Sequence, residues 1–244
     1  MNIENQREQL LLKLMHLLAK NFKNQAVLKG GMRLRLLNSP RQTQDADYVF
    51  SGQSSRREIL TRLKKIIAGE ANIKILNTEM NSRGLIIECS TGDATAFLEI
   101  ATSQILDLPP ESMTTSALAS RYQMPAQVIT IMSLAESYVH KIAACLERRA
   151  LRDLYDLTIL QPLTVLDHNV LKKRLSHLFI ERKKPVAISV AEAARRLSLR
   201  GEDLQQKNLE RELHGLVPDD FLTGGRGIIK NCLNKLCQEL LNIS

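Results

Sequence analysis

Two adjacent glycines, Gly30 and Gly31, separate a short apolar run from a short helical pattern. The apolar run covers residues 26–28, and the helical pattern covers residues 32–37. An apolar run that ends at turn residues is typical of a buried strand, and glycine lets the backbone reverse sharply between a strand and a helix. The arrangement predicts a strand, a glycine turn and a helix in direct succession. It therefore favours folds that combine a sheet with helices.

Further patterns extend this prediction along the first half of the chain. Leucines at three- and four-residue spacing predict an amphipathic helix near the N-terminus, and a second apolar stripe predicts another helix. Alternating apolar residues predict additional strands. The helices are expected at 5–22, 32–37 and 59–67, and the strands at 26–28, 46–50, 73–76, 85–89 and 94–100.

The second half of the chain follows a different pattern. Pro109 and Pro110 open a polar stretch that continues to Ser116 and is typical of a linker or an irregular connection. Beyond it the helical period dominates, and a long helix is expected from Ile131 onward. We predict an α+β fold class, with a mixed sheet and helices in residues 1–125 and a helical domain in residues 126–244.

Composition and charge predict where the protein is located and what kind of molecule it binds. No apolar run reaches the roughly 18 residues that cross a bilayer, and the N-terminus lacks the basic and apolar pattern of a signal peptide. A cytoplasmic protein without a membrane partner is expected. Lys and Arg outnumber Asp and Glu by 34 to 26, a net charge of +8, which favours a polyanionic partner such as RNA. The basic stretch 182–184, with Arg195, Arg196 and Arg200 beyond it, is either a secondary RNA contact or a solvated basic surface.

Asp45 and Asp47 stand two residues apart at the start of a predicted strand, so their carboxylates project to the same side. Such a pair can share hard cations, here Mg²⁺ or Mn²⁺, and two bound ions can activate an attacking hydroxyl and stabilise a leaving pyrophosphate. Asp45 follows Gly31 by 14 positions (45 minus 31), which is enough for one short helix and a return loop. The sequence therefore predicts an anion-binding glycine turn beside metal-binding acids.

Three segments resemble the motifs of one family, the AbiEii/AbiGii group of toxin-like proteins in the polymerase-β-type nucleotidyltransferase superfamily. The resemblance spans positions 28 to 157, and the chain beyond about Gln161 is similar only in being helical. The three segments are Leu28-Lys29-Gly30-Gly31 with Leu34, then Arg41-x-Thr43-x-Asp45-x-Asp47, and then Lys141 with Arg148-Arg149 and Arg152-Asp153-Leu154-Tyr155-Asp156-Leu157.

The resemblance implies a polymerase-β-like nucleotidyltransferase domain followed by a helical domain. The implied activity is the Mg²⁺-dependent transfer of a nucleoside monophosphate from an NTP to an acceptor, which in relatives can be the 3′ end of tRNA. The implied biological role is that of a bacterial toxin restrained by a separately encoded antitoxin. The residues expected to bind the nucleotide are Gly30, Gly31, Arg41, Thr43 and Lys141.

One residue departs from the family pattern. The family commonly has Thr after the two glycines, whereas this chain has Met32. The hydroxyl contact to phosphate is missing, so backbone N–H groups and a basic residue are expected to carry more of the binding. Lys141 is the preferred basic residue because Arg148 and Arg152 follow it at helical spacing on the same face. A solvated lysine is the alternative.

Asp153 and Asp156 each have more than one possible role. Asp156 either orients Lys141 or acts on the acceptor hydroxyl, or else it pairs with Arg152 in an ordinary surface ladder in which Arg149 also pairs with Asp153.

Glu99 is expected to be the third metal ligand, because a lone acid in an apolar strand needs a partner. The alternative without a functional role is an exposed glutamate on an edge strand. If Glu99 is not the third ligand, Glu88 on the neighbouring strand is the substitute. The predicted catalytic set is therefore Asp45, Asp47, Glu99, Lys141 and Asp156.

Two other functions are also considered. A catalytically silent module on the same fold would bind nucleic acid or an antitoxin without chemistry, and a nucleotidyltransferase could instead modify a protein. Retention of both Asp45 and Asp47 argues against silence.

Overall fold

The computed structural model describes residues 2–52, 55–81, 84–102, 105–180 and 184–243. The chain separates into two compact units, Met1–Met132 and Ser133–Ser244. Each unit is described by itself below. The first unit extends beyond residue 125 because the strand Val128–Ile131 belongs to its sheet.

Within the described residues, the first unit contains one mixed, seven-stranded sheet in the order β3-β4-β5-β2-β1-β7-β6. β2 runs parallel to β5 and β1 runs parallel to β7, while the other neighbouring pairs are antiparallel. The strands are β1 (Ala26–Lys29), β2 (Asp45–Phe50), β3 (Lys74–Met80), β4 (Leu85–Thr91), β5 (Ala94–Ala101), β6 (Glu111–Thr114) and β7 (Val128–Ile131).

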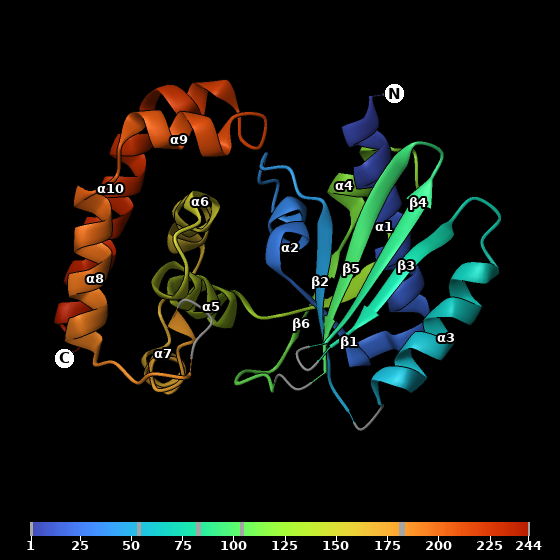
Figure 1. The fold of residues 1–244 in the computed structure, drawn as a ribbon, viewed down its shortest axis with the longest axis horizontal. Coiled ribbons are helices and arrows are strands. Elements are labelled where there is room, and N and C mark those ends of the chain that lie inside the picture. The colour runs from blue at the N-terminus through green and yellow to red at the C-terminus, as the bar shows by residue number, and fades with distance from the viewer. Residues whose placement is uncertain (1, 53–54, 82–83, 103–104, 181–183, 244) are drawn as a thin grey trace. The chain divides into compact units, whose positions relative to one another are not determined.

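Helices α1 and α3 pack on one face of this sheet, and α2 follows β1 directly (Figure 1). Polar side chains start both packing helices: Asn2 caps α1, and Ser55 forms a capping box with Glu58 at the start of α3. The helices of this unit are α1 (Ile3–Phe22), the short 3₁₀ helix η1 (Lys23–Gln25), α2 (Gly30–Leu36), α3 (Arg56–Ala68) and α4 (Ser116–Arg121).

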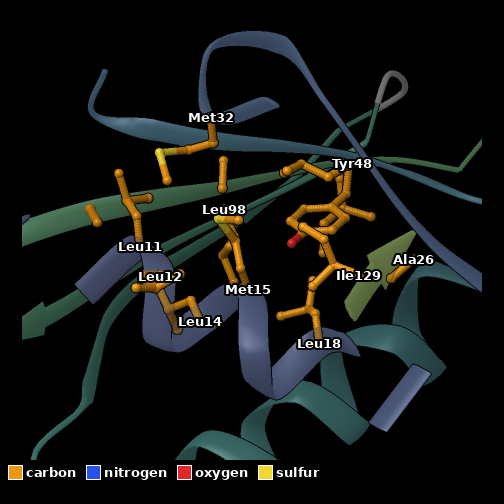
Figure 2. Packing of buried hydrophobic residues seen from close by; sticks show 14 of the residues in the cluster. Leu11, Leu12, Leu14, Met15, Leu18, Ala26, Met32, Tyr48, Leu98 and Ile129 are labelled. Atoms are coloured by element: carbon orange, nitrogen blue, oxygen red, sulfur yellow. The ribbon is translucent and has the colours of Figure 1, made fainter. Parts of the chain in front are cut away.

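The core of the first unit lies between α1 and the sheet. Leu11, Leu14 and Leu18 of α1 are at most 1% exposed. They pack in the same cluster as Leu98 of β5 and Ile129 of β7 (Figure 2). Burial of such aliphatic side chains stabilises a fold by about 1.5–3 kcal/mol each. The leucine stripe seen in the sequence therefore fixes which face of the sheet is covered, and the acids of β2 and β5 point to the other face.

Helices are the main elements of the second unit's described residues, and an isolated antiparallel bridge joins Leu178 and Val186. The core of this unit is rich in leucines, with Leu154, Leu171, Leu197 and Leu236 fully buried, and it also includes Tyr138. No described helix has the length and apolarity needed to cross a membrane. The helices are α5 (Leu134–Glu147), α6 (Leu151–Leu160), the 3₁₀ helix η2 (Gln161–Leu163), α7 (His168–Leu175), α8 (Val190–Glu202), α9 (Gln206–Leu213) and α10 (Asp219–Leu241).

The α+β class is confirmed, but two local expectations are wrong. The stretch expected as a linker contains β6, whose polar residues suit an edge strand paired only with β7. The helix expected from Ile131 is present as α5, which begins at Leu134 and ends at Glu147, but the expectation that Arg148 and Arg152 lie on the same helix as Lys141 is wrong. Arg148 adopts an extended conformation (φ −144°, ψ 159°), so Arg152 belongs to a separate helix, α6.

Candidate active site

The glycine turn packs directly against Asp47. Gly30 has φ +69°, a conformation that favours glycine. A Cβ atom at this position would lie 2.0 Å from Oδ2 of Asp47. Lys29 is the register partner of Asp47 across the antiparallel pair of β1 and β2. Two segments that are separate in the sequence therefore meet at one point, and only glycine fits between them.

The second glycine packs against the loop that leads into β2. A Cβ atom at Gly31 would lie 2.7 Å from Oγ1 of Thr43 and 2.8 Å from Nη2 of Arg41. The Thr43 hydroxyl donates to Oδ1 of Asp45 at 2.5 Å. Arg41, Thr43, Asp45 and Asp47 thus lie in one connected set with the two glycines.

The sheet register places Glu99 next to the aspartate pair. Asp45 and Asp47 share one face of β2, and Glu99 of β5 is the direct parallel partner of Asp47. Glu88 faces Phe97 and lies one strand farther away, on β4. Glu99 is exposed, as expected for the alternative in which it is a glutamate on an edge strand without a role in metal binding. However, β5 lies between β2 and β4, so the edge-strand part of that alternative is wrong.

These three carboxylates have the chemistry that Mg²⁺ or Mn²⁺ requires, because hard cations prefer oxygen ligands. Asp45 and Asp47 are half-buried, and their side of the sheet is not the side that α1 and α3 cover. Within the described part of the chain, no group of three or more Asp, Glu, His or Cys side chains is placed so that it could hold a metal ion. Asp45, Asp47 and Glu99 match a metal site in donor type and in strand register, but their side chains are not gathered around one point.

A set of contacts from α1 positions the loop that carries Arg41. The Arg35 guanidinium donates to the Glu8 carboxylate and to the Ser39 carbonyl. The Tyr122 hydroxyl donates to the same Glu8 carboxylate at 2.6 Å. The backbone N–H of Arg41 donates to Oγ of Ser39 at 3.4 Å. Sequence reasoning missed this support, although a charged residue at position 35, between Leu34 and Leu36, was a usable signal.

In the second unit, Lys141 lies between two buried carboxylates. Its Nζ is 2.9 Å from Oδ1 of Asp153 and 2.8 Å from Oδ2 of Asp156. Arg148 completes the cluster with Nε 2.7 Å from Oδ2 of Asp153. Both aspartates are 0% exposed, so the surface-ladder alternative is wrong for them. The break between α5 and α6 makes this cluster possible, because it turns α6 back toward Lys141.

The protonation of this cluster follows from burial and charge together. Burial alone would lower the pKa of Lys141, but the carboxylates of Asp156 and Asp153 raise it above its ordinary value. Burial would raise the pKa of Asp153, yet the hydrogen bond from Arg148 and the charge of Lys141 hold it near 2. Lys141 and Asp153 are therefore both ionised at neutral pH.

Arg200 of α8 fixes the turn between α5 and α6. Its guanidinium donates to the carbonyl of Arg148 at 2.8 Å and to that of Ala150 at 3.0 Å. Sequence reasoning missed this role because the contact joins positions about fifty residues apart. Residues 182 and 183 of the basic stretch considered for RNA lie outside the described residues, and Lys184 is exposed.

The fold and the site together define a class of protein. A glycine turn packed against an Asp-x-Asp pair, on a mixed sheet followed by a helical unit, is the arrangement of a nucleotidyltransferase. The family described as "Nucleotidyl transferase AbiEii toxin, Type IV TA system" matches residues 13–223. The chain belongs to this family, and it is accordingly a nucleotidyltransferase toxin that uses an NTP substrate.

Solved structures with the same fold support this assignment at the level of architecture. JHP933 from Helicobacter pylori is 17% identical with a TM-score of 0.57, over 97% of this chain and 92% of that one. A putative nucleotidyltransferase from H. pylori is 17% identical with a TM-score of 0.58, over 98% and 96%. MenT4, a nucleotidyltransferase toxin of Mycobacterium tuberculosis H37Rv, is 17% identical with a TM-score of 0.60, over 97% and 83%. None of the curated proteins compared with the chain matches it significantly.

Proposed function

We propose that this toxin transfers a nucleoside monophosphate from an NTP to RNA, at the 3′ end of tRNA, in a Mg²⁺-dependent reaction. The observation that carries the proposal is the direct packing of Gly30 against the Asp47 carboxylate, with Glu99 in register beside it. A separately encoded antitoxin is the protein partner that the family description, a type IV toxin–antitoxin system, supports.

The residues of the first unit have complementary tasks in this proposal. The Gly30-Gly31 turn presents backbone N–H groups to the phosphates, and Arg41 and Thr43 shape its other side. Asp45, Asp47 and Glu99 would hold divalent cations, which supply activation of the acceptor hydroxyl and charge neutralisation on the leaving pyrophosphate.

The residues of the second unit contribute a charged pair. Asp156 contacts the Lys141 ammonium at 2.8 Å, which suits a carboxylate that orients a nucleotide-binding lysine. The network of Arg148 and Asp153 holds this pair in a single arrangement.

RNA is favoured as the acceptor because the chain carries a net charge of +8. The test is incubation with each NTP labelled at the α-phosphate, Mg²⁺, and either total cellular RNA or total cellular protein. We expect label in material that ribonuclease destroys and protease does not. Label that survives ribonuclease but not protease would replace RNA by a protein acceptor. No incorporation into either fraction would support the silent binding module.

Glu99→Gln is expected to lower kcat by about 100-fold or more, because Glu99 is the cross-strand neighbour of Asp47. The change removes a charge from an exposed side chain without leaving a cavity, so thermal stability should stay unchanged. Glu88→Gln is the matched control, since it makes the same substitution on the neighbouring strand. The measurement is kcat across a Mg²⁺ titration. A large loss in Glu88→Gln together with normal turnover in Glu99→Gln would move the third ligand to β4.

A further inference from the structure

Arg33, in the first turns of α2, is a buried arginine with two unsatisfied groups. Its side chain is 1% exposed, and Nε donates to the carbonyl oxygen of Met132 at 2.7 Å. Nη1 and Nη2 have no hydrogen-bond partner among the described residues. Burial lowers the pKa of Arg33 to about 10, with an opposing influence from Glu111. The guanidinium is therefore charged at neutral pH while most of its donors are unused.

Such an arrangement destabilises the ligand-free protein. Its presence therefore suggests that the guanidinium has a role other than stabilising the fold. A buried ion loses its hydration, and that loss is recovered only where partners surround the charge. Arg35, two residues later on the same helix, shows the ordinary solution, because it donates to Glu8 and to the Ser39 carbonyl. Arg33 and Arg35 thus provide an internal comparison between an unsatisfied and a satisfied buried arginine.

The location of Arg33 connects it to the glycine turn. Strand β1, which ends in this turn, lies between β2 and β7. On the β2 side the turn contacts Asp47. On the β7 side the backbone N–H of Met132 donates to Leu28 at 2.9 Å, and the Met132 carbonyl holds Arg33. Asp47 therefore lies on the β2 side of β1, and the carbonyl that binds Arg33 lies on its β7 side.

We infer that the unused Nη groups of Arg33 bind a phosphate of the substrate nucleotide, an inference that rests on the proposed function. A polyphosphate lying across the turn would place negative charge between the cation-binding acids and Arg33. Met32 is 0% exposed and packs in the core, so the turn has no side-chain hydroxyl at that position. A basic side chain such as Arg33 would supply the missing phosphate donor. Because Arg33 is 1% exposed, this contact would require its unbranched side chain to change rotamer and bring the Nη groups toward the turn.

Arg33→Met tests the inference through stability and binding, without reference to turnover. Methionine fills a similar apolar volume and removes the uncompensated charge, so the melting temperature without ligand should rise by about 2–4 °C. The affinity for NTP and for inorganic tripolyphosphate should fall by about 10-fold or more, because charge-assisted hydrogen bonds are lost. Arg35→Met is the matched control and should lower the melting temperature, since it leaves Glu8 without its guanidinium.

The measurements are thermal unfolding and calorimetric titration with each of the four NTPs and with tripolyphosphate, in Mg²⁺ buffer. A lower melting temperature of ligand-free Arg33→Met would contradict the claim that the charge is uncompensated. Equal affinity in wild type and Arg33→Met would overturn the phosphate contact while leaving the proposed function intact. Absence of binding to the wild-type protein would overturn both.

Discussion

Asp47→Asn and Asp45→Asn are each expected to abolish nucleotide transfer, with a loss of about 1,000-fold or more. Asparagine keeps the size of the side chain and removes the negative charge that holds a divalent cation. At position 45 the amide oxygen can still accept the hydrogen bond that Thr43 donates at 2.5 Å, so the loop geometry should persist. The loss of activity should therefore come without unfolding.

Single-turnover transfer from labelled NTP, together with circular dichroism and thermal unfolding, measures both parts of this expectation. Asp93→Asn is a suitable control because it makes the same substitution at an exposed residue beside β5. Wild-type transfer by either Asp45→Asn or Asp47→Asn would remove the metal role from that residue. Loss of transfer that accompanies unfolding would assign the residue to the fold.

Lys141→Met is expected to produce the largest loss of stability among the substitutions considered. It removes the ammonium that contacts Asp153 and Asp156, two carboxylates that are fully buried. Breaking a buried ion pair by removing one partner typically costs about 3–5 kcal/mol, because the remaining charge stays away from water. Arg148 still contacts Asp153, so the loss should fall mainly on Asp156.

Chemical denaturation of the full chain, followed through the helical signal, measures this loss. Lys172→Met removes an exposed lysine from α7 and should change the unfolding free energy by less than about 0.5 kcal/mol. Lys141→Met combined with Asp156→Leu removes both charges and should recover much of the stability. Equal stability of Lys141→Met and wild type would mean that the lysine is merely solvated. If the double variant does not recover unfolding free energy, the loss in Lys141→Met comes from packing and not from the unpaired charge.

The sequence predicted best where local pattern and chemistry agreed. The leucine stripe of α1, the strand before the glycines and the strand that carries Asp45 and Asp47 all depend on short-range periodicity. The proximity of the glycine turn and the acids followed from the number of residues between them. In the structure, this proximity is the close packing of Gly30 against Asp47.

The features that the sequence did not predict depend on long-range contacts. β6 carries few apolar residues because it pairs only with β7, so its pattern resembles a linker. The break at Arg148 has no glycine or proline to mark it, and Arg200 holds it from a distant helix. Arg33 looked like an ordinary helix residue, because burial of its guanidinium is visible only in the folded chain.

The most direct test of the central claim is to follow the α- and γ-phosphates of the NTP separately. Two parallel reactions would contain the chain, Mg²⁺ and total cellular RNA, one with NTP labelled at the α-phosphate and the other with NTP labelled at the γ-phosphate. We predict that the α-label enters RNA, that the γ-label is released from the NTP only as pyrophosphate, and that excess chelator stops both. Transfer of the γ-label to the acceptor, or α-label incorporation that is equal in Asp47→Asn and wild type, would contradict nucleotide transfer at this site.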